Sequence, residues 1–156
     1  MIQLLPALVV IVLDQITKVA VIRALQPYEA ISVIPGFFNL VHVRNPGIAF
    51  GLLSQLGTAW SRVLLSALTT AAVILLIYWF GRVRDKDRKA AFGLSLVIGG
   101  AVGNLIDRLR LGEVVDFLDF YVGSFHWPAF NVADSAVTVG TLLLALSILF
   151  EGSAKK

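Results

Sequence analysis

The sequence predicts an all-α membrane protein built from four transmembrane helices, and two observations lead to this fold class. The 156 residues are 58% hydrophobic with a mean hydropathy of +0.85, which is too apolar for an ordinary soluble domain of this length. Four apolar stretches also approach the roughly 20 residues needed to cross a bilayer. They are long and lack strand-like alternation, so we expect helices over about residues 2–22, 59–80, 90–109 and 132–150.

The positions of the basic residues predict how these helices are oriented. The segment GRVRDKDRK (81–89) holds five Lys and Arg residues between the second and third helices, and the sequence ends in Lys155–Lys156. Cytoplasmic loops carry such an excess of basic residues. We therefore expect both termini in the cytoplasm, with residues 24–58 and 110–131 on the outer side. A nucleic-acid site is the weaker interpretation, and we expect no nucleic-acid partner.

The first outer segment is too long for a simple connection. EAISVI (29–34) and NLVHVR (39–44) have the composition of short strands, joined through Pro35–Gly36. GIAFGLLSQLG (47–57) is apolar but too short to span the membrane, which favours an interfacial helix. We expect this segment to be mobile and to gate the candidate active site discussed below. We expect these elements and the four helices to form one domain over residues 1–156.

The second outer segment is rich in aromatic residues. They are Phe120, Tyr121, Phe125, Trp127 and Phe130. Aromatic side chains gather where a membrane meets water, because their rings are amphipathic at that depth. We interpret this segment as a loop whose side chains form an interfacial aromatic belt.

Carboxylates near hydrocarbon are costly, so the acidic residues at the outer helix ends need a reason. Asp116 follows the exit of the third helix, and Asp134 lies where the fourth begins. Two carboxylates in a partly dry site cannot both ionise easily, so one keeps a proton while the other acts as a base, as in aspartic peptidases. The structural alternative, equally open on spacing alone, has Asp134 capping the fourth helix and Asp116 pairing with Arg108 or Arg110. Asp119 is expected to be exposed and structural.

Further polar residues fall at the same level of the membrane. Asn104 and Arg108 are four residues apart on one face of the third helix, and Asp107 beside them orients either Arg108 or a neighbouring helix. Asn131 stands just before the fourth helix, and Asn45 lies on the first outer segment. Such side chains can hold a peptide backbone or a developing oxyanion, or can satisfy hydrogen bonds inside the bundle.

Two other pairs in the helices have a simpler interpretation. Asp14 and Lys18 are four residues apart in the outer half of the first helix, with the acid first, which is the favourable order. An intramembrane pair is a functional candidate by default, although we favour a structural role that anchors the first helix near the site. Gly99 and Gly103 form a small-residue face on the third helix, which indicates close helix packing.

The residue inventory excludes several chemistries. The chain has no cysteine, which excludes disulfides, thiolate catalysis and cysteine metal sites. His42 and His126 are the only histidines and form no HExxH motif, so we expect no metal and no cofactor. The serines have no histidine or lysine at motif spacing, although Lys18 leaves a serine–lysine dyad formally open.

Five segments resemble the motif regions of the lipoprotein signal peptidase family, also called signal peptidase II. They are DQITK (14–18), RNPGIAF (44–50), GNLIDR (103–108), VVDFLDF (114–120) and FNVADS (130–135). The segments occur in the family's order and spacing, and the similarity covers essentially the whole chain. One departure is Pro46–Gly47–Ile48, where the family more often has a small or polar residue followed by Gly-Ala. This difference bears on the local loop geometry.

The resemblance implies a bacterial plasma-membrane aspartic endopeptidase that cleaves prolipoproteins just before a cysteine carrying diacylglycerol. The motif match places the catalytic pair at Asp116 and Asp134. It places substrate-binding or active-site residues at Asn45, Gly47, Asn104, Arg108, Asn131, Ala133, Asp14 and Lys18. It also implies membrane lipids and globomycin-like cyclic peptide inhibitors as ligands. We expect a monomer.

The lipid-modified substrate agrees with the predicted depth of the carboxylates, because its acyl chains lie in the outer leaflet and its amide must be cut there. The competing class is a transporter or proton relay, which would use the four aspartates Asp14, Asp107, Asp116 and Asp134. The sequence has no inverted repeat, and these charges gather at one interface. A third class, a non-catalytic assembly factor, would not need two carboxylates on adjacent helix ends beside asparagines.

Overall fold

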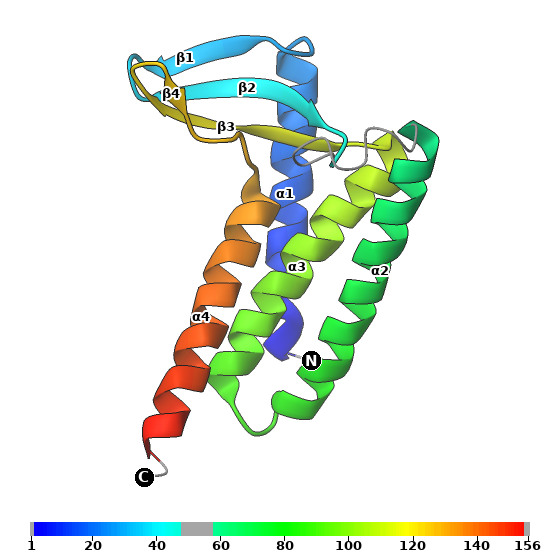
Figure 1. Ribbon diagram of the computed structural model, residues 1–156, viewed down its shortest axis with the longest axis vertical. Coiled ribbons are helices and arrows are strands. Elements are labelled where there is room, and N and C mark those ends of the chain that lie inside the picture. Colours follow the sequence, from blue (N-terminus) through cyan, green and yellow to red (C-terminus); the bar gives the residue numbers. More distant parts are fainter. Residues whose placement is uncertain (1, 48–57, 155–156) are drawn as a thin grey trace.

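The computed structural model describes residues 2–47 and 58–154, which form a helical bundle with a small sheet at one end (Figure 1). The elements are a 3-10 helix (Ile2–Leu4), α1 (Leu5–Ala24), β1 (Ala30–Ile34), β2 (Phe38–Asn45), α2 (Thr58–Val83), α3 (Arg88–Leu111), β3 (Val114–Val122), β4 (Phe125–His126) and α4 (Val132–Ala154). Four of the described helices are long and apolar enough to cross a membrane. The four predicted helices are therefore confirmed.

The ends of α3 depend on capping groups that lie outside its apolar stretch. The carboxylate of Asp87 accepts hydrogen bonds from the N–H groups of Lys89 at 2.8 Å and Ala90 at 3.0 Å, which starts the helix before the predicted residue 90. Gly112 adopts a left-handed conformation with φ of 76° and donates its N–H to the carbonyl of Arg108, which ends the helix. Hydropathy alone could not place these two boundaries.

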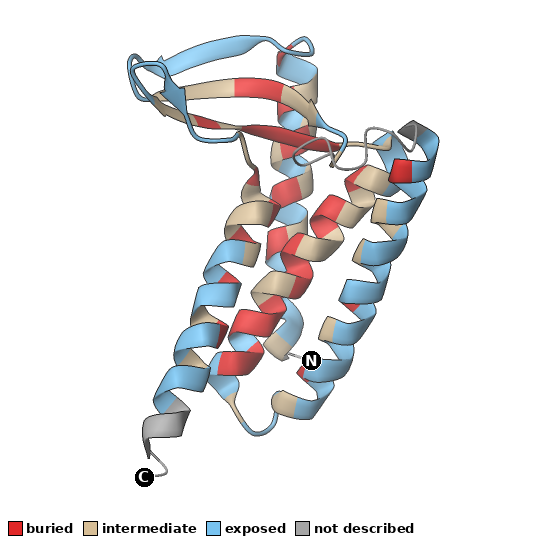
Figure 2. Cartoon of the chain, viewed as in Figure 1, coloured by how far each residue is buried: buried red, intermediate tan, exposed pale blue. Residues whose placement is uncertain are grey.

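Helix α3 is the centre of the bundle, since each of the other three long helices packs against it. Figure 2 shows buried residues gathered on α3 and exposed residues on the outer faces of α2 and α4. The predicted small-residue face is confirmed, because a Cβ added to Gly99 would lie 2.8 Å from the carbonyl oxygen of Ala7. The backbone N–H of Ala7 also donates to Ser95 Oγ at 3.0 Å, which joins α1 to α3.

Helices α3 and α4 approach each other equally closely. A Cβ on Gly140 would lie 2.6 Å from the carbonyl oxygen of Gly93, and a Cβ on Gly100 would overlap the carbonyl of Ala133. Glycine at these positions lets the two backbones meet without an intervening side chain. The start of α4 is therefore held directly against the middle of α3.

The sheet is antiparallel, with strand order β1-β2-β3-β4. The predicted strand pair joined through Pro35–Gly36 is confirmed as β1 and β2. Residues 110–131 connect the third and fourth helices as predicted, but the sequence analysis did not predict the strands β3 and β4, which occupy much of this segment. Two aspartates, Asp116 and Asp119, interrupt the apolar pattern of β3. Their odd spacing of three places them on opposite faces of the strand.

Apolar contacts fix the sheet to the outer end of α1. Phe117 of β3 packs with Val21 and Leu25 in a buried cluster. On the sheet, Phe120 stacks on Phe38 with ring centroids 4.8 Å apart and on Phe130 at 5.9 Å. Two members of the predicted aromatic belt are therefore packed into the fold.

The ends of the bundle differ in character. The sheet, the end of α3 and the start of α4 lie together, whereas the beginning of α1, the end of α4 and the α2–α3 turn lie at the opposite end (Figure 1). This arrangement agrees with the predicted order of crossings, and the side that faces the cytoplasm stays a prediction. The predicted interfacial helix and gate at 47–57 lies outside the described residues except for Gly47.

Candidate active site

The two predicted catalytic aspartates meet at the sheet end of the bundle. Asp116 is on β3 with only 2% of its surface exposed, and Asp134 is half-buried in the first turn of α4. They come from a strand and a helix, and β4 lies between these two elements in the chain. The structure thus brings together two carboxylates that sequence topology placed only at the same interface.

Both carboxylate oxygens of Asp116 accept hydrogen bonds from asparagine side chains. Asn131 Nδ2 donates to Oδ1 at 2.7 Å, and Asn45 Nδ2 donates to Oδ2 at 2.9 Å. Strand pairing brings Asn45 to this position, because Val43 of β2 lies opposite Asp116 in the register. The amides fix the plane of the carboxylate, which forms no ion pair with any described Lys, Arg or His side chain.

Asp134 is held by a reciprocal pair of hydrogen bonds at the start of α4. Its Oδ2 accepts the backbone N–H of Asn131 at 3.2 Å, and Asn131 Oδ1 accepts the backbone N–H of Asp134 at 2.9 Å. This is the geometry of a capping box. Its Oδ1 also accepts a hydrogen bond from Asn104 Nδ2 at 2.8 Å. Asp134 therefore caps α4, as the structural alternative predicted. The other part of that alternative is not observed, because Asp116 forms no ion pair with Arg108 or Arg110, and the structure describes all three residues.

Asn131 connects the two aspartates. It is fully buried, and its side chain contacts Asp116 while its backbone and side chain cap Asp134. The same Nδ2 lies 3.2 Å from Asn104 Oδ1 and 3.2 Å from the carbonyl oxygen of Val115. One amide thus sets the relative orientation of both carboxylates.

The environment of Asp116 favours its protonated form. Burial raises the pKa of this carboxyl from 3.8 to about 6. The hydrogen bond from Asn45 opposes that rise, the negative charge of Asp134 adds to it, and the bond from Asn131 opposes it. A carboxyl that titrates this close to neutral pH can exchange a proton during a reaction.

The predicted pair of Asp14 and Lys18 is buried, and α3 joins it. Lys18 Nζ lies 2.9 Å from Asp14 Oδ2, 2.8 Å from Asp107 Oδ2 and 2.8 Å from Asn104 Oδ1. Asp107 therefore binds the neighbouring helix, the second of the two roles that its position allowed. No described serine is among the partners of Lys18, which disfavours a serine–lysine dyad.

Asp14 also positions the start of α4. Its Oδ1 accepts the backbone N–H of Ala133 at 3.0 Å, so α1 satisfies one of the free N–H groups of that helix. Ala133 was predicted as a substrate-binding or active-site residue, and the structure places it fully buried against α1 and α3. Gly47 has a similar local role: its φ is 76° and its N–H donates to Asn45 Oδ1 at 2.8 Å.

Arg108 is the cation nearest the dyad on α3. It is half-buried, and its Nη1 lies 3.4 Å from the backbone carbonyl oxygen of Asn104. Its charge interacts with the carboxylates of Asp107, Asp116 and Asp134. It forms no ion pair with any described carboxylate, so its guanidinium keeps donors for a bound peptide.

Gln15 belongs to the same network and was not singled out from the sequence. Its Nε2 donates to Asp107 Oδ1 at 3.0 Å, to the carbonyl of Gly103 at 3.2 Å and to Asp14 Oδ2 at 3.2 Å. Its position beside Asp14 in an apolar helix could have predicted this role from the sequence. Such a group in hydrocarbon needs partners, as Asp14 does.

Asp119 was predicted to be exposed, and this prediction was wrong. Its surface is 7% exposed, its Oδ2 accepts a hydrogen bond from Asn39 Nδ2 at 2.9 Å, and its Oδ1 lies 2.9 Å from His126 Nδ1. The imidazole of His126 is stacked on Tyr121 with ring centroids 4.8 Å apart. Asp119 faces away from Asp116 along β3, so the two neighbouring aspartates serve separate clusters.

The dyad region offers groups for proton transfer and for holding a peptide. Within residues 2–47 and 58–154, no cluster of three or more His, Asp or Glu side chains is arranged to hold a metal ion. The side chains that converge there are two carboxyls, three asparagine amides and one guanidinium. One carboxylate and one carboxylic acid beside such donors can activate water and protonate a leaving amine.

Comparisons with known proteins agree over most of the chain. A family model described as Signal peptidase (SPase) II matches residues 6–150. The chain is 50% identical to the lipoprotein signal peptidase of Geobacter metallireducens over 139 residues, which cover 89% of this chain and 85% of the relative. It is 45% identical to that of Desulforapulum autotrophicum over 142 residues, which cover 91% and 88%. A solved structure of a bacterial membrane enzyme superposes with a TM-score of 0.84 at 35% identity, covering 99% of this chain and 91% of that one.

Proposed function

This chain belongs to the signal peptidase II family, whose members cleave lipoprotein signal peptides, and on this premise we propose that it is an aspartic endopeptidase with Asp116 and Asp134 as its catalytic pair. The observation that carries the proposal is that Asn131 contacts both carboxyls. The chain is a multi-pass membrane protein with four candidate spans. Its substrate would be a prolipoprotein that already carries diacylglycerol on the cysteine after the cleaved bond.

The proposed reaction uses one ionised and one protonated carboxyl. The ionised member takes a proton from a water molecule as the water oxygen attacks the scissile carbonyl carbon. The protonated member donates its proton to the carbonyl oxygen, which gives a neutral tetrahedral intermediate. When the C–N bond breaks, that hydroxyl returns a proton to the dyad and a dyad proton moves to the leaving amine. The products are a carboxylic acid and an amine, and the dyad ends in its starting state.

The surrounding polar residues have supporting roles in this proposal. Asn45 and Asn131 hold Asp116, and Asn104 holds Asp134. Arg108 offers N–H donors to the substrate backbone or to the carbonyl oxygen as its charge develops. Asp14 and Lys18 act through the position of α1 and α4, because neither side chain is exposed to a bound peptide.

The position of the dyad at the end of the bundle supports a lipid-modified substrate. The acyl chains of such a substrate lie in one leaflet, and its scissile amide lies near the interface where water is present. We propose that the sheet end faces outward and both termini face the cytoplasm of a bacterial plasma membrane. Residues 1–156 would act as one peptidase domain in a monomer, and globomycin-like cyclic peptides would occupy the same site.

The competing transporter class is less well supported by the arrangement of charges. A proton relay needs titratable groups at successive depths, whereas Asp14, Asp107, Asp116 and Asp134 belong to one connected network at one end. Two of these carboxylates are already paired with Lys18. The described network is compact and holds a carboxyl pair, which favours local proton exchange.

The proposed function is tested with the purified chain in detergent and a diacylglyceryl-modified prolipoprotein. Mass spectrometry should find one cut, on the N-terminal side of the lipidated cysteine. The matched precursor without diacylglycerol should remain uncut, and a chelator should leave the rate unchanged. Cleavage of both precursors alike would contradict the substrate assignment. Loss of cleavage on chelation, restored by zinc, would contradict the aspartic mechanism.

A further inference from the structure

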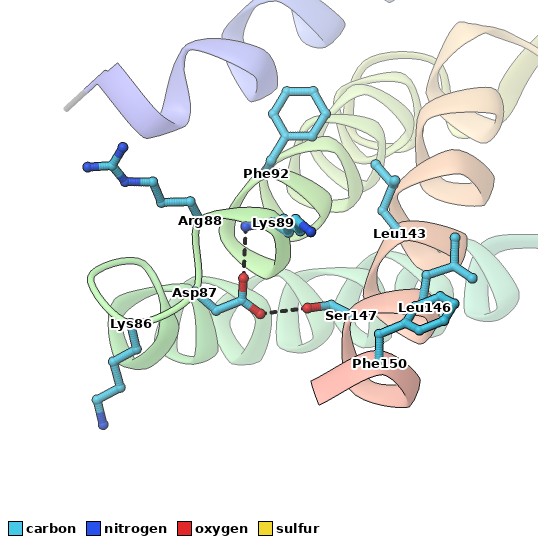
Figure 3. Close-up of a pocket in the computed structure, with 9 residues that line it drawn as sticks. All are labelled: Lys86, Asp87, Arg88, Lys89, Phe92, Leu143, Leu146, Ser147 and Phe150. Carbon is cyan, nitrogen blue, oxygen red and sulfur yellow. Dashed lines mark hydrogen bonds between the residues drawn. The ribbon is translucent and has the colours of Figure 1, made fainter. Parts of the chain in front are cut away.

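A separate hollow opens at the opposite end of the bundle from the aspartates. It has a volume of about 840 Å³ and lies between the first turn of α3 and the last turns of α4. Figure 3 shows basic side chains of residues 86–89 on one side and the apolar side chains of Leu143, Leu146 and Phe150 on the other. The proposed proteolytic reaction uses none of these residues.

The basic side of this hollow has cations available for a ligand. Lys86, Arg88 and Lys89 are exposed and form no ion pair within the described part of the chain. The carboxylate in the lining, Asp87, caps α3 and accepts a 2.6 Å hydrogen bond from the hydroxyl of Ser147. Three bases against one acid leave a net charge of +2 on the lining. The hollow therefore favours an anionic group.

The apolar side of the hollow continues toward the membrane interior. Leu143, Leu146 and Phe150 belong to the last turns of α4, and Phe92 of α3 is 48% exposed beside them. The hydrogen bond between Asp87 and Ser147 connects the basic turn to α4, which holds the basic and apolar sides of the hollow at a fixed distance from each other. A ligand that fills this hollow has an anionic part and a hydrocarbon part.

A second hollow of about 470 Å³ adjoins the first. Arg88 and Phe92 line both hollows, and the second is completed by Gln3, Pro6 and Ala91. Arg88 and Phe92 therefore stand between a groove toward α4 and a groove toward α1. This arrangement has one basic turn and two apolar grooves, which matches one anionic headgroup carrying two acyl chains.

We propose that this end of the bundle binds an anionic phospholipid. Its phosphate contacts the basic turn at residues 86–89, and its two acyl chains lie on either side of Phe92. Span α2 ends and span α3 begins at this turn, so the headgroup is at the level of the membrane surface. Basic pockets between membrane helices on the cytoplasmic side are suited to anionic headgroups, and the predicted topology places this turn there.

The test is native mass spectrometry of the purified chain in detergent micelles with added dioleoylphosphatidylglycerol or dioleoylphosphatidylcholine. The chain should retain phosphatidylglycerol in preference to phosphatidylcholine. Arg88→Gln should lower that retention about fivefold, the effect expected for one base at a membrane surface. Arg82→Gln is the matched control, since it removes the same charge near the same turn from a residue outside both hollows. It should leave retention unchanged.

Two further arms test the apolar grooves. Leu146→Trp fills the larger groove without changing charge and should lower retention of the anionic lipid. Dihexanoylphosphatidylglycerol, which has the same headgroup and short chains, should bind the unmodified chain at least tenfold more weakly. Equal losses in Arg82→Gln and Arg88→Gln would overturn the proposal in favour of general surface charge. Equal retention of the short-chain lipid, or competition by inorganic phosphate at the same concentration, would overturn the two-chain lipid site.

Discussion

Lys18 and Asn104 meet inside the bundle, with 2.8 Å between Nζ and Oδ1, although 86 residues separate them in the sequence. Asn104 also donates from Nδ2 to Asp134 Oδ1 at 2.8 Å. A buried cation of α1 is thus one side chain away from a carboxylate of α4. The packing of α1 against α3 therefore affects the orientation of Asp134.

Lys18→Met should destabilise the fold strongly. Methionine keeps the unbranched shape but leaves the carboxylates of Asp14 and Asp107 buried without their cation. Breaking a buried ion pair in this way costs roughly 3–5 kcal/mol. The free energy of unfolding in detergent measures the effect. Lys86→Met, at an exposed lysine, is the control and should change stability by less than about 0.5 kcal/mol. Similar losses in both variants would mean that the buried pairing is unimportant.

Asp116→Asn and Asp134→Asn should each abolish cleavage while the protein stays folded and inserted. Asparagine keeps the volume and an acceptor oxygen but cannot exchange the proton. The double variant should be little worse than either single one, because the pair acts as a unit. Signal-peptide release from a diacylglyceryl-modified substrate is measured alongside binding of a globomycin-like inhibitor. Robust turnover by either single variant would refute the mechanism, and joint loss of folding and binding would favour purely structural roles.

Asp116→Asn should also change how stability depends on pH. Burial raises the pKa of Asp116 from 3.8 to about 6, so the folded state holds this proton more tightly than the unfolded chain does. The resulting stabilisation is complete below pH 3.8 and is lost as the pH rises through 6, a change of about 3 kcal/mol. Asparagine cannot ionise, so the variant should gain stability relative to the unmodified chain between pH 4 and pH 8.

The measurement for this pH effect is the difference in free energy of unfolding between the two chains at several pH values. Only the change with pH is diagnostic, because asparagine also loses one of the two acceptor oxygens that Asn45 and Asn131 use. Asp85→Asn is the control, since it makes the same substitution at an exposed aspartate. A parallel pH profile for Asp116→Asn would contradict the raised pKa.

Asp119→Ala and His126→Ala should weaken the outer part of the sheet without stopping catalysis. Each removes one side of the contact between Asp119 Oδ1 and His126 Nδ1, which links β3 to β4. A double-mutant cycle on the free energy of unfolding should give a coupling of about 1 kcal/mol. Cleavage should fall less than tenfold, because this cluster faces away from Asp116. A coupling near zero, or a loss of activity equal to that of Asp116→Asn, would contradict the assignment.

Gly100→Ala should separate α3 from α4 and displace Asp134. The added methyl group would overlap the carbonyl of Ala133, one residue before that aspartate. Overpacking of this kind costs about 1–3 kcal/mol, and cleavage should fall with stability. Gly81→Ala is the control, because nothing lies within 4 Å of its added methyl group. Unchanged unfolding and activity in Gly100→Ala would show that α3 and α4 can move apart without cost.

The four long helices were predictable from the sequence, because a membrane span requires a long apolar segment whose backbone hydrogen bonds are satisfied internally. The meeting of Asp116 and Asp134 at one end followed from the same topology. Strand β3 was not predictable in this way, because its two aspartates break the alternation that marks a half-buried strand. Its pairing with β2 depends on contacts such as Asn45 with Asp116, which are 71 residues apart.

The sequence predicted which residues belong to the candidate active site better than it predicted what each of them contacts. Asn131 was identified as polar and well placed, yet its contacts with both aspartates depend on how α4 begins. Asp119 was assigned to the surface because nothing in the sequence shows that the side chain of His126, which pairs with Tyr121 in the next strand, reaches it. Burial of a polar residue follows from tertiary partners, and a single sequence does not list those partners.

The pairing of Asp14 with Lys18 inside one helix has a consequence for biogenesis. Helix α1 is synthesised before α3, so its later partner Asp107 does not exist when the Asp14–Lys18 pair first enters the membrane. During that interval the lysine already has a counter-ion one turn away, so this part of the newly inserted segment carries no net charge into the lipid. Helix α1 can therefore remain stably inserted in the membrane before α3, the central helix of the bundle, has been made.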